Sequence, residues 1–182
     1  MKILKRLVFL VETILLFLYT NVCIGDVGIY TSIALDSNNY PHISYRDQTN
    51  LILKYAKWNG ISWDIEIVDD DGMPGMYSSI IIDKNNYPHI SYHYLDYYGF
   101  KNYYQLRYAR HDGTKWKIET IDSLTTGVSF PPKDEGVGEF TSIDLDSNNN
   151  PHISYYKETN YELKYASFRC CTIHSRCIQI CP

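Results

Sequence analysis

Apolar and polar residues alternate with a period of two through much of the chain after its first 25 residues. In "TSIALD", "SSIIID" and "TSIDLD" apolar residues recur at every second position, and "PHISY" resumes the alternation after a short polar turn. A period of two places alternate side chains on one face of a β-strand, and no stretch beyond residue 25 keeps a helical period. The pattern therefore predicts short antiparallel strands. The alternating apolar pairs are Ile33 and Leu35, Ile80 and Ile82, and Ile143 and Leu145.

One phrase occurs three times, as "NNYPHISY" at 38–45 and 85–92 and as "NNNPHISY" at 148–155. Each copy goes on to "LKYA" or "LRYA", and two continue through "NGISWDIEIVD" or "DGTKWKIETID". The Asn-Gly and Asp-Gly dipeptides at 59–60 and 112–113 predict tight hairpin turns in which both central residues have positive φ. Each full copy thus predicts a four-stranded meander. Such units of about 40 to 50 residues are typical of β-propeller blades.

The repeats place blades at about 28–70, 75–122 and 138–168, within a repeat region that spans 26–168. The third copy ends in "RCCTIHSRCIQICP", and 169–182 is expected to be a cysteine-rich irregular tail in place of a fourth strand. Propellers close with about four to eight blades. We therefore expect an all-β, β-propeller-like fold with about three four-stranded antiparallel blades, incomplete and open. Either several copies complete a ring, or the chain is a truncated or frameshifted relative of a longer protein; exposed sheet edges favour truncation.

The first 25 residues have the order of a secretory signal peptide. Three basic residues precede an apolar run from Leu7 to Tyr19, and small residues lie before Asp26. The run contains Glu12 and is shorter than the roughly 20 apolar residues of a membrane-spanning helix. We expect cleavage before Asp26, no membrane span afterwards, and a secreted or cell-surface protein.

Charge and composition narrow the class of partner. The net charge is −4 and no basic stripe is present, which argues against nucleic acid. The 18 tyrosines suit half-buried strands, because a tyrosine has an apolar ring and a polar tip.

The motifs "SIxxDxxNxPHISY", "LKYA" and "NGxSWxIExVD" resemble those of secreted bacterial and archaeal β-propeller repeat proteins, loosely similar to sialidase-like and Asp-box propellers. The resemblance covers 28–168 and implies an extracellular propeller. "HDGTKW" at 111–116 is similar to an Asp-box, but it lacks the residue that the motif keeps between Asp and Gly. This departure weakens the link to sialidases in particular.

Histidine and aspartate recur at the same place in every copy. A reaction centre is built once from residues with different roles, so a residue present in each blade is expected to make a structural hydrogen bond in each blade. The aspartates also open "DSNN" or "DKNN", where carboxylate and amide oxygens would suit calcium; Asx-turns are the competing interpretation, and no other cofactor is expected. The repeated residues are His42, His89, His152, Asp36, Asp83 and Asp146.

Two irregular segments carry the other candidates. The second copy has a longer loop, "HYLDYYGFKNYYQ", whose tyrosines could present rings and hydroxyls to a sugar or a protein, or could pack on one another. The tail holds four cysteines, for which disulfide pairing, a zinc site with His174, and aberrant sequence are the alternatives. The ligand-binding candidates are Tyr94, Asp96, Tyr97, Tyr98, Tyr103 and Tyr104, and the disulfide candidates are Cys170, Cys171, Cys177 and Cys181.

The sequence predicts a noncatalytic extracellular binding or scaffold module that recognises a glycan or a protein, with self-association as a way to complete the propeller. The alternative is a fragment of a sialidase-like glycoside hydrolase or a polysaccharide lyase, in which arginines grip an acidic sugar. Few arginines lie outside the signal and no carboxylate constellation stands apart from the repeats, so we do not expect an enzyme.

Overall fold

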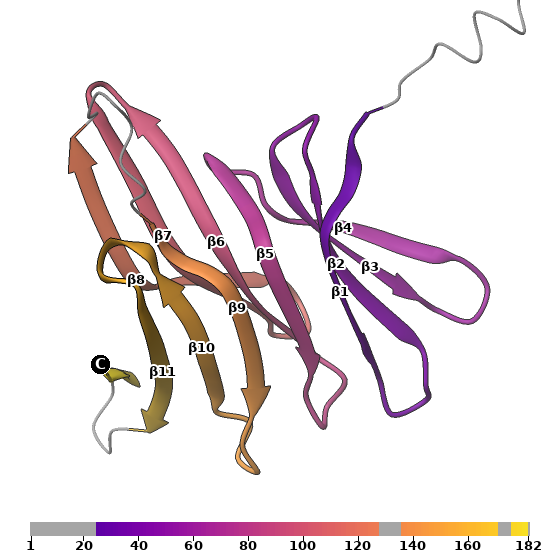
Figure 1. Cartoon of the computed structure of the whole chain (residues 1–182). Helices are drawn as coiled ribbons and strands as arrows, with labels where there is room; N and C mark the ends of the chain where they lie inside the picture. The colour runs from indigo at the N-terminus through magenta and orange to yellow at the C-terminus, as the bar shows by residue number, and fades with distance from the viewer. Residues whose placement is uncertain (1–24, 128–135, 171–175, 182) are drawn as a thin grey trace, which may run out of the picture.

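Three four-stranded antiparallel sheets make up the fold, and in each sheet the strands follow one another in chain order (Figure 1). The computed structural model describes residues 25–127, 136–170 and 176–181. The predicted architecture, an open β-propeller-like arrangement of three blades, is confirmed. The strands are β1 (Val27–Leu35), β2 (Pro41–Asp47), β3 (Ile52–Trp58) and β4 (Trp63–Asp69); β5 (Met73–Ile82), β6 (Pro88–Tyr98), β7 (Lys101–His111) and β8 (Trp116–Gly127); β9 (Val137–Leu145), β10 (Pro151–Lys157), β11 (Glu162–Cys170) and β12 (Arg176–Cys181).

The first strands of the three sheets lie next to one another, since β5 contacts both β1 and β9 (Figure 1). Each second strand begins at the predicted proline, where a missing N–H costs least. A short 3-10 turn, η1 (Glu158–Asn160), links β10 to β11. The sheets thus stand side by side as successive wedges.

The third sheet differs from the expectation of an irregular tail at 169–182. β11 extends to Cys170, and Arg176–Cys181 forms β12, which pairs with β11 from Tyr165↔Cys181 to Cys170↔Arg176. The physical reason is visible in "RCIQIC", where β-branched isoleucines alternate with other residues at period two. In the second sheet, β8 likewise runs beyond the predicted end at residue 122, because the lengthened β7 gives it further partners up to Gly127.

The hairpin turns at residues 59 and 112 also differ from the prediction. Gly60 and Gly113 both have φ +96°, whereas Asn59 and Asp112 are not among the residues with positive φ. The loops are four residues long, and the Asn59 side-chain oxygen accepts the N–H groups of Ile61 and Ser62 at 2.9 Å. Because the side chain holds the turn, only the glycine needs the left-handed conformation.

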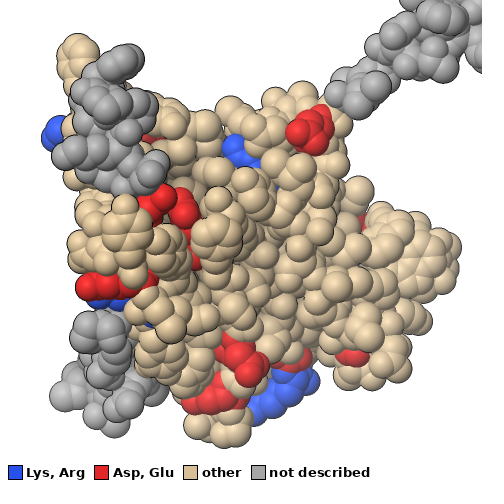
Figure 2. Space-filling model, in the orientation of Figure 1, with Lys and Arg blue, Asp and Glu red and all other residues tan. Residues whose placement is uncertain are grey.

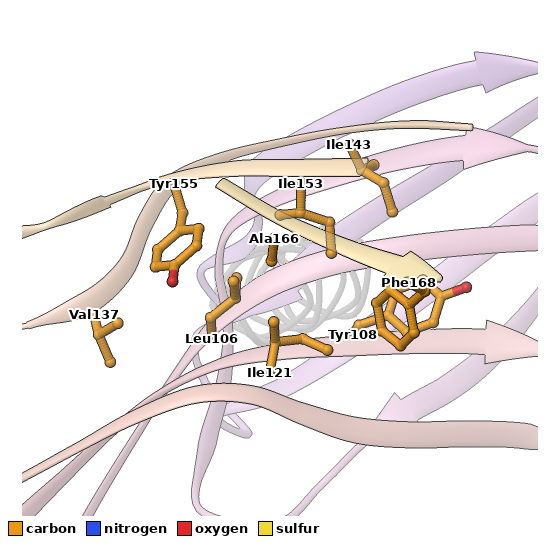
Figure 3. Close-up of a cluster of buried hydrophobic side chains, with 9 residues drawn as sticks. All are labelled: Leu106, Tyr108, Ile121, Val137, Ile143, Ile153, Tyr155, Ala166 and Phe168. Atoms are coloured by element: carbon orange, nitrogen blue, oxygen red, sulfur yellow. The ribbon is translucent and has the colours of Figure 1, made fainter. Parts of the chain in front are cut away.

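Apolar side chains fill the spaces between neighbouring sheets. Ile90 and Tyr92 of β6 belong to a cluster with Leu53 of the first sheet, while Ser91 faces the third sheet and lies 2.5 Å from the Thr141 hydroxyl. Alternate positions of one strand therefore serve the two neighbouring sheets, as the period of two predicts. The cluster between the second and third sheets, drawn in Figure 3, consists of Leu106, Tyr108, Ile121, Val137, Ile143, Ile153, Tyr155, Ala166 and Phe168.

The predicted signal peptide lies outside the described residues except for Gly25, and so does Cys171. The side chains of Cys170, Cys177 and Cys181 are likewise not described, so the disulfide pairing stays a prediction. Within the part of the chain that the structure describes, no helix has the length and apolar character needed to cross a membrane.

Candidate functional site

A pocket of about 340 Å³ opens at the junction of the second and third sheets. This volume falls within the range of about 300 to 1,000 Å³ that small-molecule sites occupy. The turn from β5 to β6, the end of β7, the turn from β9 to β10 and β11 form its walls. Figure 2 shows acidic and basic atoms gathered at the end of the molecule where these two turns lie. The lining residues with functional side chains include Asp83, His89, Tyr108, Arg110, Asp112, Asn149 and Phe168.

The repeated histidine of the second sheet lies at the base of this pocket. The ring of His89 has its Nδ1 2.5 Å from the Tyr108 hydroxyl oxygen and its Nε2 3.7 Å from Asp83 Oδ2. Both partners belong to the same sheet as the histidine. The residue is 6% exposed, so these contacts satisfy polar atoms that water does not reach easily.

The same three residue types make the same contacts in the other two sheets. In the first sheet, His42 lies 2.5 Å from the Tyr55 hydroxyl and 3.5 Å from Asp36. In the third sheet, the corresponding distances are 2.5 Å from His152 to Tyr165 and 3.8 Å from His152 to Asp146. Each imidazole lies within its own sheet, so the three do not converge on one centre. The pKa of His42 is lowered, because the effect of burial outweighs the opposing effect of the hydrogen bond with Asp36.

The repeated aspartates hold the turns between the first two strands of each sheet. Asp83 Oδ1 accepts the N–H groups of Asn85 at 2.9 Å and Tyr87 at 2.8 Å, which is the geometry of an Asx-turn. Hydrogen bonds from the Asn150 side chain and backbone lower the pKa of Asp146 in the same way. One oxygen of each carboxylate is thus committed to the backbone. Among the described residues, no group of three or more His, Cys, Asp or Glu side chains could hold a metal ion.

Arg110 stands out among the residues that line the pocket. Its Nε is buried and has no hydrogen-bond partner among the described residues. No acidic side chain among these residues forms an ion pair with its guanidinium. Arg107, three residues earlier on β7, instead bonds Asp69 at 2.9 Å and Asp71 at 3.1 Å. A buried N–H of a charged group without an acceptor costs free energy, so the Arg110 guanidinium is a donor that a ligand could satisfy.

Asp112 supplies a fixed negative charge at the rim. Its carboxylate lies 2.6 Å from Lys117 Nζ and accepts hydrogen bonds from the Thr114 hydroxyl and N–H at 2.7 and 3.0 Å. The lysine first, and then Thr114 and the backbone of Lys115, hold the pKa of Asp112 far below its usual range. The group is therefore ionised at any physiological pH.

Aromatic rings form one wall of the pocket. The rings of Tyr108 and Phe168 lie 5.1 Å apart, and Figure 3 shows them together at one end of the apolar cluster. Asn149 comes from the third sheet, and its amide nitrogen lies 3.4 Å from Asp83 Oδ2. The pocket thus combines a cationic donor, carboxylate and amide acceptors, and an aromatic surface.

The junction of the first and second sheets has a smaller pocket of about 180 Å³. There, Lys57 takes the repeat position of Arg110, and Tyr87 takes the position of Asn150. The tyrosine is the longer side chain, and its hydroxyl lies 2.8 Å from the site of a Cβ on Gly113 of the same sheet. The larger pocket thus lies at the junction where the third copy departs from the repeat at this position.

The tyrosine-rich loop of the second copy forms the extended hairpin between β6 and β7. Its register pairs Asp96 with Tyr103 and Tyr97 with Asn102, so Tyr94, Asp96, Tyr98 and Tyr103 share one face, whereas Tyr97 and Tyr104 lie on the other. Tyr94 is buried under Arg107, whose guanidinium carbon lies 3.4 Å from the ring centre, and Tyr104 packs against the cluster of Figure 3. The six residues therefore do not form one surface. A binding role for the exposed Tyr97 and Tyr98 stays a prediction.

Sequence reasoning singled out Asp83 and His89 of the pocket, but it missed Arg110, Asp112, Asn149 and Phe168. The signal that could have found them lies in the differences between copies. The second copy has Arg110 at the position where the first copy has Lys57. Phe168 of the third copy occupies the position of Trp58 and His111 in the first two copies, at the end of the third strand.

No protein-family model matches the chain, and no curated protein matches it. Among solved structures, the chain is similar to a fucose lectin from Kordia zhangzhouensis in complex with methyl-fucoside. The identity is 15%, the match covers 82% of this chain and 96% of the lectin chain, and the TM-score is 0.46. The similarity is distant and assigns no ligand to this chain.

Proposed function

We propose that the protein is a noncatalytic extracellular carbohydrate-binding module, and that the pocket between the second and third sheets holds the sugar. The observation that carries the proposal is Arg110, which lines the pocket and whose buried Nε has no acceptor among the described residues. Sugar hydroxyls both donate and accept hydrogen bonds, so a sugar site needs donors and acceptors side by side. The pocket supplies both.

Each wall of the pocket suits one part of a sugar. The Arg110 guanidinium can donate to two neighbouring hydroxyl oxygens, because its N–H groups form a planar fork. Asp112 and Asn149, on opposite sheets, can accept from hydroxyl groups. The aromatic wall made by Tyr108 and Phe168 offers an apolar surface to the C–H face of a pyranose ring.

The carboxylates of the pocket suit binding better than hydrolysis. A glycosidase needs one carboxylic acid that remains protonated near neutral pH, beside a second carboxylate. Asp112 has a lowered pKa because of Lys117, and Asp83 uses one oxygen to hold its turn. The environment of Asp112 therefore does not favour the protonated form that a general acid needs. Turnover of chromogenic glycosides by the purified chain would reverse this choice in favour of the hydrolase alternative.

The test starts with a glycan array, followed by calorimetric titration of the best sugar into the wild-type chain and two variants. Arg110→Gln removes the charged donor from the larger pocket, whereas Lys57→Gln makes the matched change at the equivalent position of the first sheet. A hydrogen bond from a charged group is worth about 1.5 to 3 kcal/mol, so we expect Arg110→Gln to weaken binding roughly 10- to 100-fold. Lys57→Gln should leave the affinity unchanged.

Two results would contradict the proposal. One is full affinity in Arg110→Gln. The other is a loss of affinity in Tyr98→Ala, at the exposed tip of the hairpin, that exceeds the loss in Arg110→Gln.

A further inference from the structure

Each end of the arc of sheets has a face with no neighbouring sheet among the described residues. On the first sheet, the row Ile33, Ile43, Ala56 and Ile65 runs across all four strands. Ile33 is 63% exposed, while its counterparts Ile80 and Ile143 are 6% and 7% exposed against a preceding sheet. We call this the leading face. Its exposed apolar residues are Ile33, Leu35, Trp63, Ile65 and Ile67.

On the third sheet, the opposite face is open; we call it the trailing face. Leu163 is 75% exposed there, whereas its counterparts Leu53 and Leu106 are fully buried against a following sheet. Tyr165 is 38% exposed, whereas Tyr55 and Tyr108 are buried. The trailing face therefore has the same residue types that, in the first two sheets, pack against the next sheet.

The two internal junctions show how a leading face meets a trailing face. A hydroxyl pair crosses each one, Ser44 to Ser78 at 2.9 Å and Ser91 to Thr141 at 2.5 Å. A glycine of each leading face also lies against a leucine of each trailing face. A Cβ on Gly75 would lie 3.1 Å from Leu53 Cβ, and a Cβ on Gly138 would lie 2.7 Å from Leu106 Cα.

The two open faces carry the same groups at the same repeat positions. Ser154 and Leu163 belong to the trailing face, and Thr31 and Gly28 belong to the leading face. Gly28 has φ +98°, close to the +91° of Gly75 and the +92° of Gly138, yet a Cβ there would meet nothing within 4 Å. Its backbone thus has the conformation that the other two glycines use to approach a leucine, without the leucine.

A row of aromatic rings, tilted against one another by 51° and 50°, also ends at the two open faces. Tyr30, Tyr77 and Phe140 occupy one repeat position on β1, β5 and β9, with ring centres 4.9 and 4.6 Å apart. All three have φ near +50°, which is rare for aromatic residues. Phe140 is 66% exposed and Tyr30 is 39% exposed, so each end of the row can take another ring.

We propose that the leading face of one chain docks on the trailing face of a second copy, so that two chains close a ring head to tail. Two copies contribute six sheets and three copies contribute nine, and only six falls within the four to eight blades of closed propellers. In this dimer, Ser154 meets Thr31 of the second copy and Leu163 meets its Gly28. Few charged atoms lie over the lobe of β3 and β4 in Figure 2, in keeping with an apolar contact.

The junction between chains is less apolar than the internal ones. Asp144 takes the place of Ala34 and Ile81 on the trailing face. Burial of an unpaired carboxylate opposes association. The dimer should therefore be reversible and dissociate on dilution.

The test is the mass of the purified chain by sedimentation over a range of micromolar concentrations. The wild-type chain should approach twice the mass of a single chain as concentration rises. Leu163→Asp on the trailing face and Ile33→Asp on the leading face should each raise the dimer dissociation constant by about 100-fold or more, because an unpaired charge enters the contact. The control Phe100→Asp, at the 88% exposed tip of the hairpin, should dimerise like the wild type.

Mixing the two variants tests the head-to-tail geometry. The mixture has one junction with both native faces and one junction that carries both substitutions, so the mixed dimer should form through the native junction although each variant alone is monomeric. A wild-type chain that stays monomeric at every concentration would overturn the proposal. So would dimers of either variant alone, or a mixture that stays monomeric. Both substituted residues are exposed in the single chain, and circular dichroism checks that each variant keeps its sheets.

Discussion

Removing one leucine at three equivalent positions would measure what a neighbouring sheet contributes to stability. Leu53 and Leu106 are fully buried between sheets, and Leu163 is 75% exposed at the open end of the arc. The three share one place in the repeat "LKYA" or "LRYA". Their local sequence is nearly constant, so differences between them report the neighbouring sheet.

The expected magnitudes follow from burial. Truncating a buried leucine to alanine removes transfer free energy and leaves a cavity, which together cost about 2 to 5 kcal/mol of unfolding free energy. Leu106→Ala and Leu53→Ala should fall in this range, with melting temperatures lowered by roughly 10 °C for a chain of this size. Leu163→Ala should change the free energy of unfolding by no more than about 0.5 kcal/mol, as surface substitutions do.

Urea unfolding followed by tryptophan fluorescence would give the three values. The chain should be dilute enough to sediment as a monomer, so that association does not add to the apparent stability. Unchanged m-values would show that each substitution acts on stability and leaves the cooperative unit intact. A cost at Leu163 equal to the cost at Leu106 would refute the assignment of an open trailing face.

Two further predictions concern the contacts between sheets. His93 donates from Nδ1 to the Val137 carbonyl at 2.8 Å, and burial lowers its pKa to about 4. Because the unfolded ring titrates near 6.5, the contribution of neutral His93 to the free energy of unfolding should be complete above that pH and fall by about 3 kcal/mol as the pH drops to 4. The variant His93→Gln should flatten this dependence of the unfolding free energy on pH. An unchanged dependence would contradict the assignment to His93. Gly138→Ala should cost several kcal/mol more than Gly28→Ala in chemical denaturation of the monomer, since both have similar positive φ but only Gly138 has Leu106 against it. Equal costs would show that backbone strain alone requires these glycines.

Much of the fold could be predicted because its information is local. A period of two assigns Ile33 and Leu35 to one face whatever lies opposite, and the repeated proline marks where each second strand begins. The last strand was harder to predict, because "RCIQIC" has little resemblance to "WDIEIVD" and this segment becomes a strand only through its pairing with β11. The turn at Asn59 was misjudged since its side chain supplies a bond that the dipeptide pattern does not include.

The pocket could not be predicted because it depends on how two sheets meet. Arg110 appears in the sequence as the counterpart of Lys57 on an ordinary strand, and the strand pattern does not show that its Nε is buried without an acceptor. The tyrosines of the hairpin show that proximity in sequence does not make one surface. They are close in sequence, but the alternation along the strands distributes them over two faces, and the Arg107 guanidinium covers the ring of Tyr94.

The most direct test of the account is a crystal structure of the chain with the sugar that binds best on the glycan array. The account predicts density for the sugar between Arg110 and Asn149, with a hydroxyl oxygen within hydrogen-bond distance of the Arg110 guanidinium and the ring against Phe168. Density for the sugar at the hairpin tip or along the aromatic row of Tyr30, Tyr77 and Phe140, with the pocket between the second and third sheets filled by water, would contradict it.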